Sequence, residues 1–100
     1  MRDRIPEIIK RKTGNDVKQR ILGDDEYLQY LLKKIIEEAA ELQHSEEVGN
    51  MQEELADILE IICAILKLKG WSMENVVKIQ KEKREKNGGF EKRILMMKKV

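Results

Sequence analysis

The sequence predicts an all-α protein, a helical bundle that a second copy of the chain completes. The composition is helical, because Lys, Glu, Leu and Ile dominate while aromatic residues make up only 4% of the chain. Apolar residues recur three and four positions apart through the middle of the chain, without β-forming runs bounded by turn signals. The one proline lies near the N-terminus. Together these observations favour helices joined by short turns.

Both ends of the chain are predicted to be short extended or irregular arms. Residues 1–23 are expected to start extended, with one short helical turn that Pro6 can open because its missing N–H is not needed there. Gly14 and then Gly23 break the chain. The tail, residues 90–100, alternates apolar and basic residues, and is either a short helix or an extended arm.

Three helices are predicted between these arms. The first begins at an N-cap provided by Asp24 or Asp25, and is expected to fade between residues 44 and 49. The second runs from about residue 50 to 69, and the third from about 73 to 86 or 87. The cap and stop residues that set these limits are Gly70, Ser72, Gly88 and Gly89.

The second helix is apolar around most of its circumference. Its apolar positions are Leu55, Ile58, Leu59, Ile61, Ile62, Ile65, Leu66 and Leu68. Such a helix is buried on most sides, and three helices of one short chain could hardly surround it. We therefore expect a homodimer or homotetramer, with a four-helix core formed by the long helices of two subunits. The alternative is a monomer with an exposed apolar face. Residues 1–100 are predicted to form a single domain.

The charge balance and the apolar pattern exclude several classes of protein. The net charge of +1 argues against a generic polyanion binder, so no nucleic-acid partner is expected. The longest apolar stretch, residues 58–68, is too short to cross a bilayer, and no signal sequence is visible. A soluble, cytoplasmic protein without a membrane partner is expected. Cys63 is the only cysteine, and its apolar surroundings predict a small buried hydrophobe.

A constellation of carboxylates is the strongest functional signal. Glu37, Glu38 and Glu41 lie three and four residues apart on the first long helix, so they share a face. Glu54 and Asp57 are similarly placed on the second helix. In an antiparallel hairpin both groups lie near the connecting turn, where their side chains can converge.

Converging carboxylates repel one another and lose hydration unless they are protonated or share a cation. Oxygen ligands suit a hard ion, Mg²⁺ or Mn²⁺, which takes further ligands from substrate phosphates. The chemistry implied is cleavage of a phosphate ester or anhydride. An ion-pair network on a charged surface is the alternative. Small residues beside the acids, Ala39, Ala40 and Ala56, favour the metal site because they let two helices approach closely.

The order of these acids resembles the signature of a known family. Glu37-Glu38-x-x-Glu41, followed after a gap by Glu54-x-x-Asp57, resembles the MazG-like all-α nucleoside triphosphate pyrophosphohydrolases. Phosphoribosyl-ATP pyrophosphohydrolases are a related branch. The opening segment, residues 2–9, and the segment 83–90 also resemble parts of this superfamily. The resemblance covers nearly the whole chain.

The resemblance implies cleavage between the α- and β-phosphates, which gives a nucleoside monophosphate and pyrophosphate. It implies that Glu38, Glu41, Glu54 and Asp57 bind Mg²⁺, with Mn²⁺ as an alternative ion. Glu37 would lie behind these ligands or would position or deprotonate the attacking water, so Glu37 and Glu38 are the predicted catalytic residues.

Basic residues are the candidates for binding the substrate. Lys34 shares a face with Glu37 and Glu38, and either pairs with Glu38 or reaches a phosphate. A charged run on the third helix is typical of a solvated face, but the resemblance favours phosphate or sugar contacts. The predicted substrate-binding residues there are Lys83, Arg84 and Asn87, with Arg2 and Arg4 as weaker candidates.

Three other features leave alternatives open. Trp71, Tyr27 and Tyr30 could stack on a base or pack against the bundle. The sequence Glu41-x-x-His44 is a motif of di-iron four-helix bundles, although Glu54 and Asp57 would then be surplus. A helical dimerisation module without catalysis is the third interpretation, and it predicts indifference to Mg²⁺.

Overall fold

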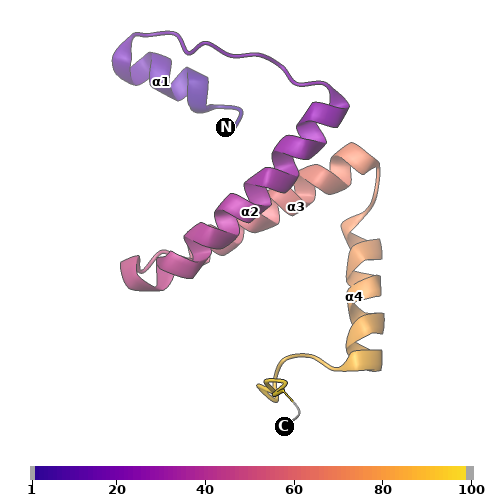
Figure 1. Ribbon diagram of the computed structural model, residues 1–100. Coiled ribbons are helices and arrows are strands. Elements are labelled where there is room, and N and C mark those ends of the chain that lie inside the picture. The colour runs from indigo at the N-terminus through magenta and orange to yellow at the C-terminus, as the bar shows by residue number, and fades with distance from the viewer. Residues whose placement is uncertain (1, 99–100) are drawn as a thin grey trace.

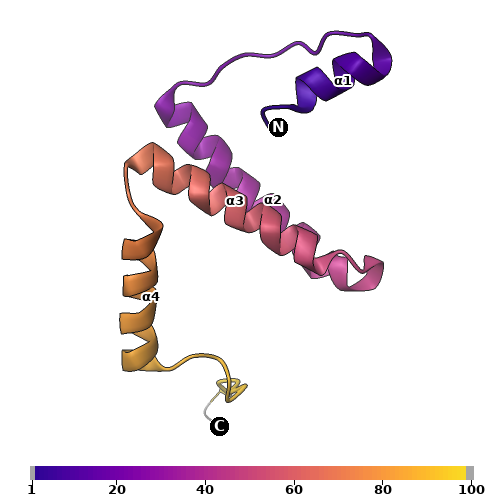
Figure 2. The same ribbon diagram turned by 180° about the vertical axis from the view of Figure 1, so that it is seen from behind.

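The computed structural model describes residues 2–98, and within them it is all-helical (Figure 1). Its helices are α1 (Ile5–Thr13), α2 (Asp24–Val48), α3 (Met51–Lys69) and α4 (Met73–Asn87). Helices α2 and α3 pack against each other along their length as a hairpin, and α4 leaves them at the far end of α3 (Figures 1 and 2). The predicted all-α fold class is confirmed.

A tight turn at Gly49 and Asn50 joins α2 to α3 and makes the hairpin antiparallel. Gly49 has a φ of 75°, which favours glycine, and its N–H donates to the carbonyl of Ser45 at 2.9 Å. The first long helix therefore ends at Val48, within the predicted range of residues 44–49. Ser45 is 1% exposed, and its hydroxyl donates to the carbonyl of Leu42 at 2.6 Å, so this polar side chain is satisfied inside the last turn.

The other helix ends show which capping predictions hold. Gly23, and not Asp24 or Asp25, is the N-cap of α2; the two aspartates lie in the first turn, where negative charge favours the helix dipole. Ser72 caps α4 as predicted, since its hydroxyl accepts from the N–H of Asn75 at 3.1 Å. The stop at Gly70 is also confirmed.

The two arms differ from each other. The N-terminal arm, residues 2–23, contains the nine-residue helix α1, which is longer than the predicted single turn. Its later part has no helix and leads to α2. The C-terminal arm is irregular over residues 90–98, which decides between the two predicted alternatives there; residues 99–100 lie outside the described part.

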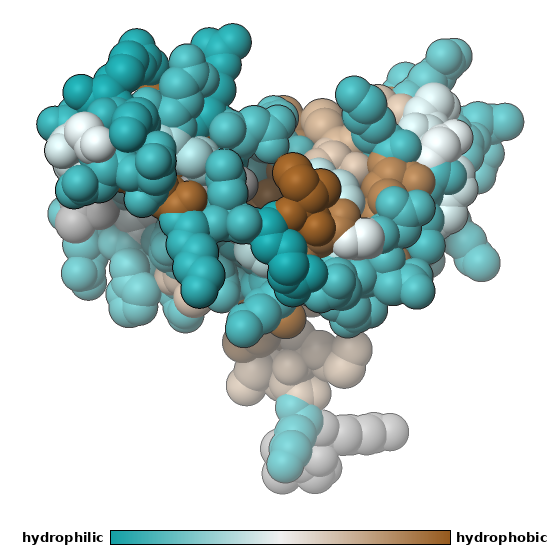
Figure 3. Space-filling view, turned by 90° about the horizontal axis from the view of Figure 1, so that it is seen from above, coloured by the Kyte–Doolittle hydropathy of each residue, from teal (hydrophilic) through white to brown (hydrophobic). Residues whose placement is uncertain are grey.

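A single copy of the chain has very little core. Among residues 2–98, the buried apolar side chains are those of Leu31, Ile61 and Leu66. Apolar side chains reach the surface between hydrophilic ones (Figure 3), and Cys63 is exposed, contrary to its predicted burial. The accessible surface is 9697 Å², against about 5,900 Å² for a compact monomer of this mass. The radius of gyration is 18.2 Å, against about 13 Å.

The described helices include none that is both long and apolar enough to cross a membrane.

Candidate metal centre

Three carboxylates converge where α2 packs against α3. Glu38 and Glu41 project from the same face of α2, and the antiparallel path of α3 brings Glu54 opposite them. Each side chain offers one oxygen, and these oxygens lie within 4.8 Å of one another. Glu38 is 7% and Glu54 9% exposed, whereas Glu41 is open to solvent. We call this group the carboxylate cluster.

Two buried oxygens of the cluster have no hydrogen-bond partner. They are Oε2 of Glu38 and Oε2 of Glu54. The other oxygen of each side chain is engaged: Oε1 of Glu38 lies 3.5 Å from Nζ of Lys34, and Oε1 of Glu54 accepts from Nδ2 of Asn50 at 3.3 Å. Because a buried carboxylate oxygen without a partner is costly, the arrangement requires either a proton or a cation between the acids.

The pKa of Glu54 also indicates that a proton or a cation is needed between these acids. The neighbouring carboxyl group of Glu38, then burial, then the charge of Glu41 raise the pKa of Glu54 from 4.5 to about 7. Because its pKa is raised, Glu54 keeps a proton at pH values at which an ordinary glutamate is ionised. A divalent cation bound by the same oxygens would remove the need for the proton. The all-oxygen donor set therefore fits Mg²⁺ or Mn²⁺.

Lys34 lies at the edge of the cluster and contacts two acids. Its Nζ is 3.5 Å from a carboxylate oxygen of Glu37 and 3.5 Å from one of Glu38. Burial acts to lower the pKa of Lys34, but the charges of Glu38 and Glu37 outweigh it and raise the pKa. The predicted shared face is therefore observed. Glu37 is half exposed, and lies outside the cluster.

Asp57, the fourth predicted metal ligand, has a different partner. It lies one turn beyond Glu54 on α3, and its carboxylate accepts a hydrogen bond from the guanidinium of Arg2. The structure thus brings three of the four predicted ligands together and holds the fourth beside them by an ion pair.

A pocket of about 550 Å³ opens next to the cluster. The N-terminal arm, α2 and α3 line it with charged, aromatic and apolar side chains: Arg2, Asp3, Arg4, Tyr27, Tyr30, Leu31, Lys34, Glu38, Asp57, Glu60, Ile61 and Ala64. Tyr27 and Tyr30 are therefore placed where a base could stack. Trp71 is 58% exposed and does not line this pocket.

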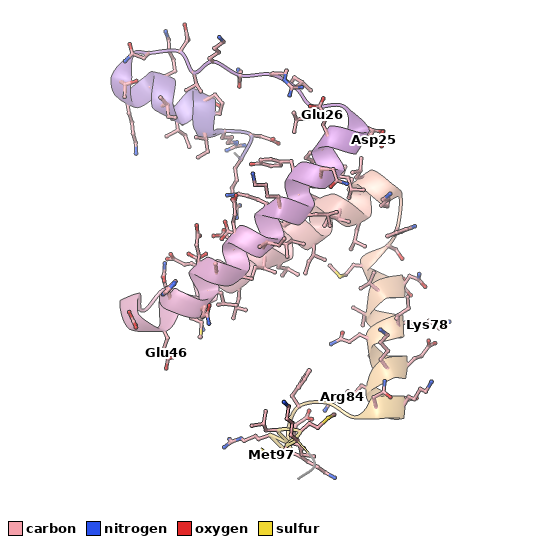
Figure 4. All side chains as sticks on the ribbon, viewed as in Figure 1. Asp25, Glu26, Glu46, Lys78, Arg84 and Met97 are labelled. Carbon is pink, nitrogen blue, oxygen red and sulfur yellow. The ribbon has the colours of Figure 1, made fainter. Side chains whose placement is uncertain are left out.

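The predicted substrate-binding residues of α4 lie elsewhere in the single chain. Lys83, Arg84 and Asn87 are all exposed, towards the end of α4 that is remote from the hairpin (Figure 4). Arg84 forms an ion pair with Glu91 of the C-terminal arm. His44 is exposed and does not belong to the carboxylate cluster, so the described site lacks the histidine of a di-iron motif.

Asn50 is a residue of the site that sequence reasoning missed. Its Nδ2 donates to Glu54, and its Oδ1 is buried without a hydrogen-bond partner. Asn50 was expected only as the start of the second helix. The available signal was its position four residues before Glu54, which places the two side chains on one helical face.

Comparison with known families agrees with this architecture. The model of the MazG nucleotide pyrophosphohydrolase domain matches residues 26–88. This range contains all of α3 and α4, and all of α2 except its first two residues. The chain belongs to the MazG nucleotide pyrophosphohydrolase family, whose members usually use a divalent metal. No match was found among curated proteins or among solved structures.

Proposed function

We propose that this protein is a Mg²⁺-dependent nucleoside triphosphate pyrophosphohydrolase, with Mn²⁺ as an alternative ion. It would cleave the bond between the α- and β-phosphates to give a nucleoside monophosphate and pyrophosphate. The observation that carries the proposal is the carboxylate cluster with its two buried, partnerless oxygens. Membership of the MazG family supports the class of reaction.

In this proposal Glu38, Glu41 and Glu54 would hold the metal, and Asp57 would join them once separated from Arg2. The bound metal would supply Lewis acidity at the phosphates. Glu37 would position the attacking water and take its proton, since it lies beside Glu38 but keeps solvent access. The water oxygen would form a bond to one phosphorus of the α–β anhydride while the bond from that phosphorus to the bridging oxygen breaks, which releases the nucleoside monophosphate and pyrophosphate. Lys34 would offset the negative charge that the leaving phosphate gains.

The pocket beside the cluster supports a nucleotide as substrate. Tyr27 and Tyr30 give it aromatic surfaces on which a base can stack, and the basic side chains Lys34, Arg2 and Arg4 can face phosphates. The pocket volume of about 550 Å³ is within the usual range for small-molecule sites.

We also propose that a second copy of the chain packs against the hairpin and completes a four-helix core. Leu55 and Leu59 of α3 are 51% and 53% exposed, and Ile36 of α2 is 71% exposed. The large accessible surface and small core of one copy support this assembly. In such a dimer, Lys83, Arg84 and Asn87 would bind substrate at the partner's cluster, because α4 of one chain points away from its own.

The test is release of pyrophosphate from a panel of common and modified nucleoside triphosphates and phosphoribosyl-ATP, with Mg²⁺ and with EDTA. The proposal predicts Mg²⁺-dependent formation of pyrophosphate and a monophosphate from at least one triphosphate. Cleavage of phosphoribosyl-ATP alone would assign the chain to the related branch. Formation of orthophosphate and a diphosphate, or no cleavage with any member, would contradict the proposal.

A further inference from the structure

Two ion pairs join the N-terminal arm to the hairpin. Arg20 pairs with Glu26 in the first turn of α2, and Arg2 pairs with Asp57 of α3, 55 residues away in the sequence. The guanidinium of Arg2 donates to a carboxylate oxygen of Asp57. Helix α1 has no buried residue, so the arm gains little from packing of its own. Within residues 2–98, this is the ion pair that joins the arm to α3.

Both side chains of the Arg2–Asp57 ion pair are exposed to solvent, so each can separate from the other and bind a different partner. The side chain of Arg2 is 61% exposed, and that of Asp57 is 38% exposed. Exposed ion pairs are weak, because water solvates both charges when they separate. Asp57 also lies one helical turn from Glu54 of the carboxylate cluster, so a positive charge beside Asp57 lies beside the cluster.

The same arginine lines the pocket. Arg2 and Arg4 reach it from the arm, while Lys34, Glu38 and Asp57 reach it from the hairpin. Arg2 therefore lies between the carboxylates that line the pocket and the space that a ligand would fill. The family match begins at residue 26, so it assigns no role to the arm.

We propose that Arg2 is an exchangeable counter-ion, which pairs with Asp57 when no divalent cation is present and binds the nucleotide phosphates when one is. Asp57 cannot serve the guanidinium and a divalent cation fully at once. Arg2, once released, remains at the pocket and offers a planar fork of donors that matches phosphate oxygens. This inference rests on the proposed function, since it assumes that metal and nucleotide bind at this site.

The first experiment titrates Mn²⁺ alone into wild-type protein and Arg2→Gln by calorimetry, without nucleotide. Removing the competing cation should lower the Mn²⁺ dissociation constant by about two- to fivefold, as expected for an exposed ion pair. Arg11→Gln is the matched control, because Arg11 is an exposed arginine of α1 that does not line the pocket. It should leave the constant within experimental error of wild type.

The second experiment measures binding of an α,β-methylene nucleoside triphosphate, which the enzyme cannot cleave, in saturating Mg²⁺. Arg2→Gln should weaken this binding roughly tenfold, because a charge-assisted hydrogen bond to phosphate is lost. Arg2→Lys keeps the charge but not the fork, so it should restore wild-type Mn²⁺ affinity and only part of the nucleotide affinity. The analogue must match a nucleotide that the wild-type enzyme cleaves.

The two effects have opposite signs, and this distinguishes exchange from a structural tether. If Arg2→Gln leaves both affinities unchanged, or weakens both, the inference is wrong while the proposed function stands. If wild-type protein binds no Mn²⁺ and cleaves no nucleotide, the proposed function itself fails and the inference fails with it.

Discussion

The hairpin of α2 and α3 carries an acidic motif, and α4 carries a basic one. A single copy of the chain holds the acidic side chains in place but not the basic ones. On the hairpin, Glu38 and Glu54 are buried on two packed helices and their oxygens meet. On α4, Lys83, Arg84 and Asn87 are exposed, and within residues 2–98 the close helix packing is that of α2 against α3. Helix packing restricts the first set of side chains, whereas the second set lies in solvent, where Arg84 pairs with Glu91.

This difference teaches that spacing along one helix is a weak predictor of a site until a second element faces it. Two packed helices force carboxylates together, which is costly without a cation and is therefore informative. A basic run on a solvated helix costs nothing, so it is compatible with either surface charge or substrate binding. A second subunit could give α4 the facing element that it lacks.

The largest expected effect comes from removing one member of the carboxylate cluster. Glu38→Gln should reduce Mg²⁺-dependent pyrophosphate release by more than about 100-fold, because a ligand and its charge are lost at a metal that drives the reaction. Glu53→Gln is the matched control, since Glu53 is an exposed neighbour of Glu54. A Glu38→Gln variant with wild-type kcat would show that the carboxylate cluster is not required for catalysis.

The next effect tests the proposed dimer directly. Leu59→Glu should raise the dimer dissociation constant by about 100-fold or more, because it buries an unpaired charge in the subunit interface. Sedimentation velocity at several protein concentrations measures this shift. Ile21→Glu, at an apolar residue that is 94% exposed outside the helices, should leave the oligomeric state unchanged. Wild-type protein that sediments as a monomer would contradict the assembly.

Mixing two inactive or impaired variants tests whether α4 acts at the site of the partner subunit. Lys83→Ala should raise KM roughly tenfold, as expected for a lost charge-assisted contact to phosphate. If Lys83 acts at the partner's cluster, an equal mixture of Glu38→Gln and Lys83→Ala chains should regain about a quarter of the wild-type sites by random pairing. No gain on mixing, assayed at low substrate concentration, would place Lys83 at its own chain's site or on a solvated face.

The smallest effect concerns pH. In the metal-free protein, the pKa of Glu54 is raised from 4.5 to about 7, so the folded state binds this proton more tightly than the unfolded state. This contribution to the free energy of unfolding therefore decreases as pH rises from 4.5 to 7 and is constant above 7. Thermal unfolding in EDTA should show a Tm lower by a few degrees at pH 8 than at pH 5 from this group.

Glu54→Gln should remove that part of the pH dependence, whereas Glu53→Gln should retain it. Saturating Mg²⁺ should reverse the trend in the wild-type protein, because metal binding requires deprotonated ligands and stabilises the folded state. A Tm that follows the same pH profile in wild type and Glu54→Gln would show that Glu54 is not the titrating group.

Much of the fold was accessible from the sequence because its signals are local. Gly70 and Ser72 mark helix ends through backbone conformation and capping, and both predictions are confirmed. The predicted single turn in the N-terminal arm and the predicted N-cap at Asp24 or Asp25 were wrong, since short helices and cap positions depend on a few tenths of a kcal/mol to about 1 kcal/mol. Cys63 was expected to be buried, but it is exposed in a single copy of the chain.

The site was predicted where it depends on helical spacing and the hairpin turn. Glu38, Glu41 and Glu54 converge as expected, because the turn at Gly49 fixes the register of α2 against α3. The pairing of Arg2 with Asp57 could not be predicted, since it joins segments 55 residues apart and no local spacing signals it. The assignments of the metal ligands and of the α4 residues remain predictions.

The most direct test of the central claim, that the carboxylate cluster is a divalent-metal site, is a crystal structure with Mn²⁺ and anomalous diffraction data. The account predicts a Mn²⁺ peak in direct coordination with Glu38, Glu41 and Glu54, and with Asp57 when Arg2 has moved away. The peak should be absent from crystals of Glu38→Gln grown in the same conditions. Well-ordered carboxylates without a peak between them, or a peak only at another site, would contradict the claim.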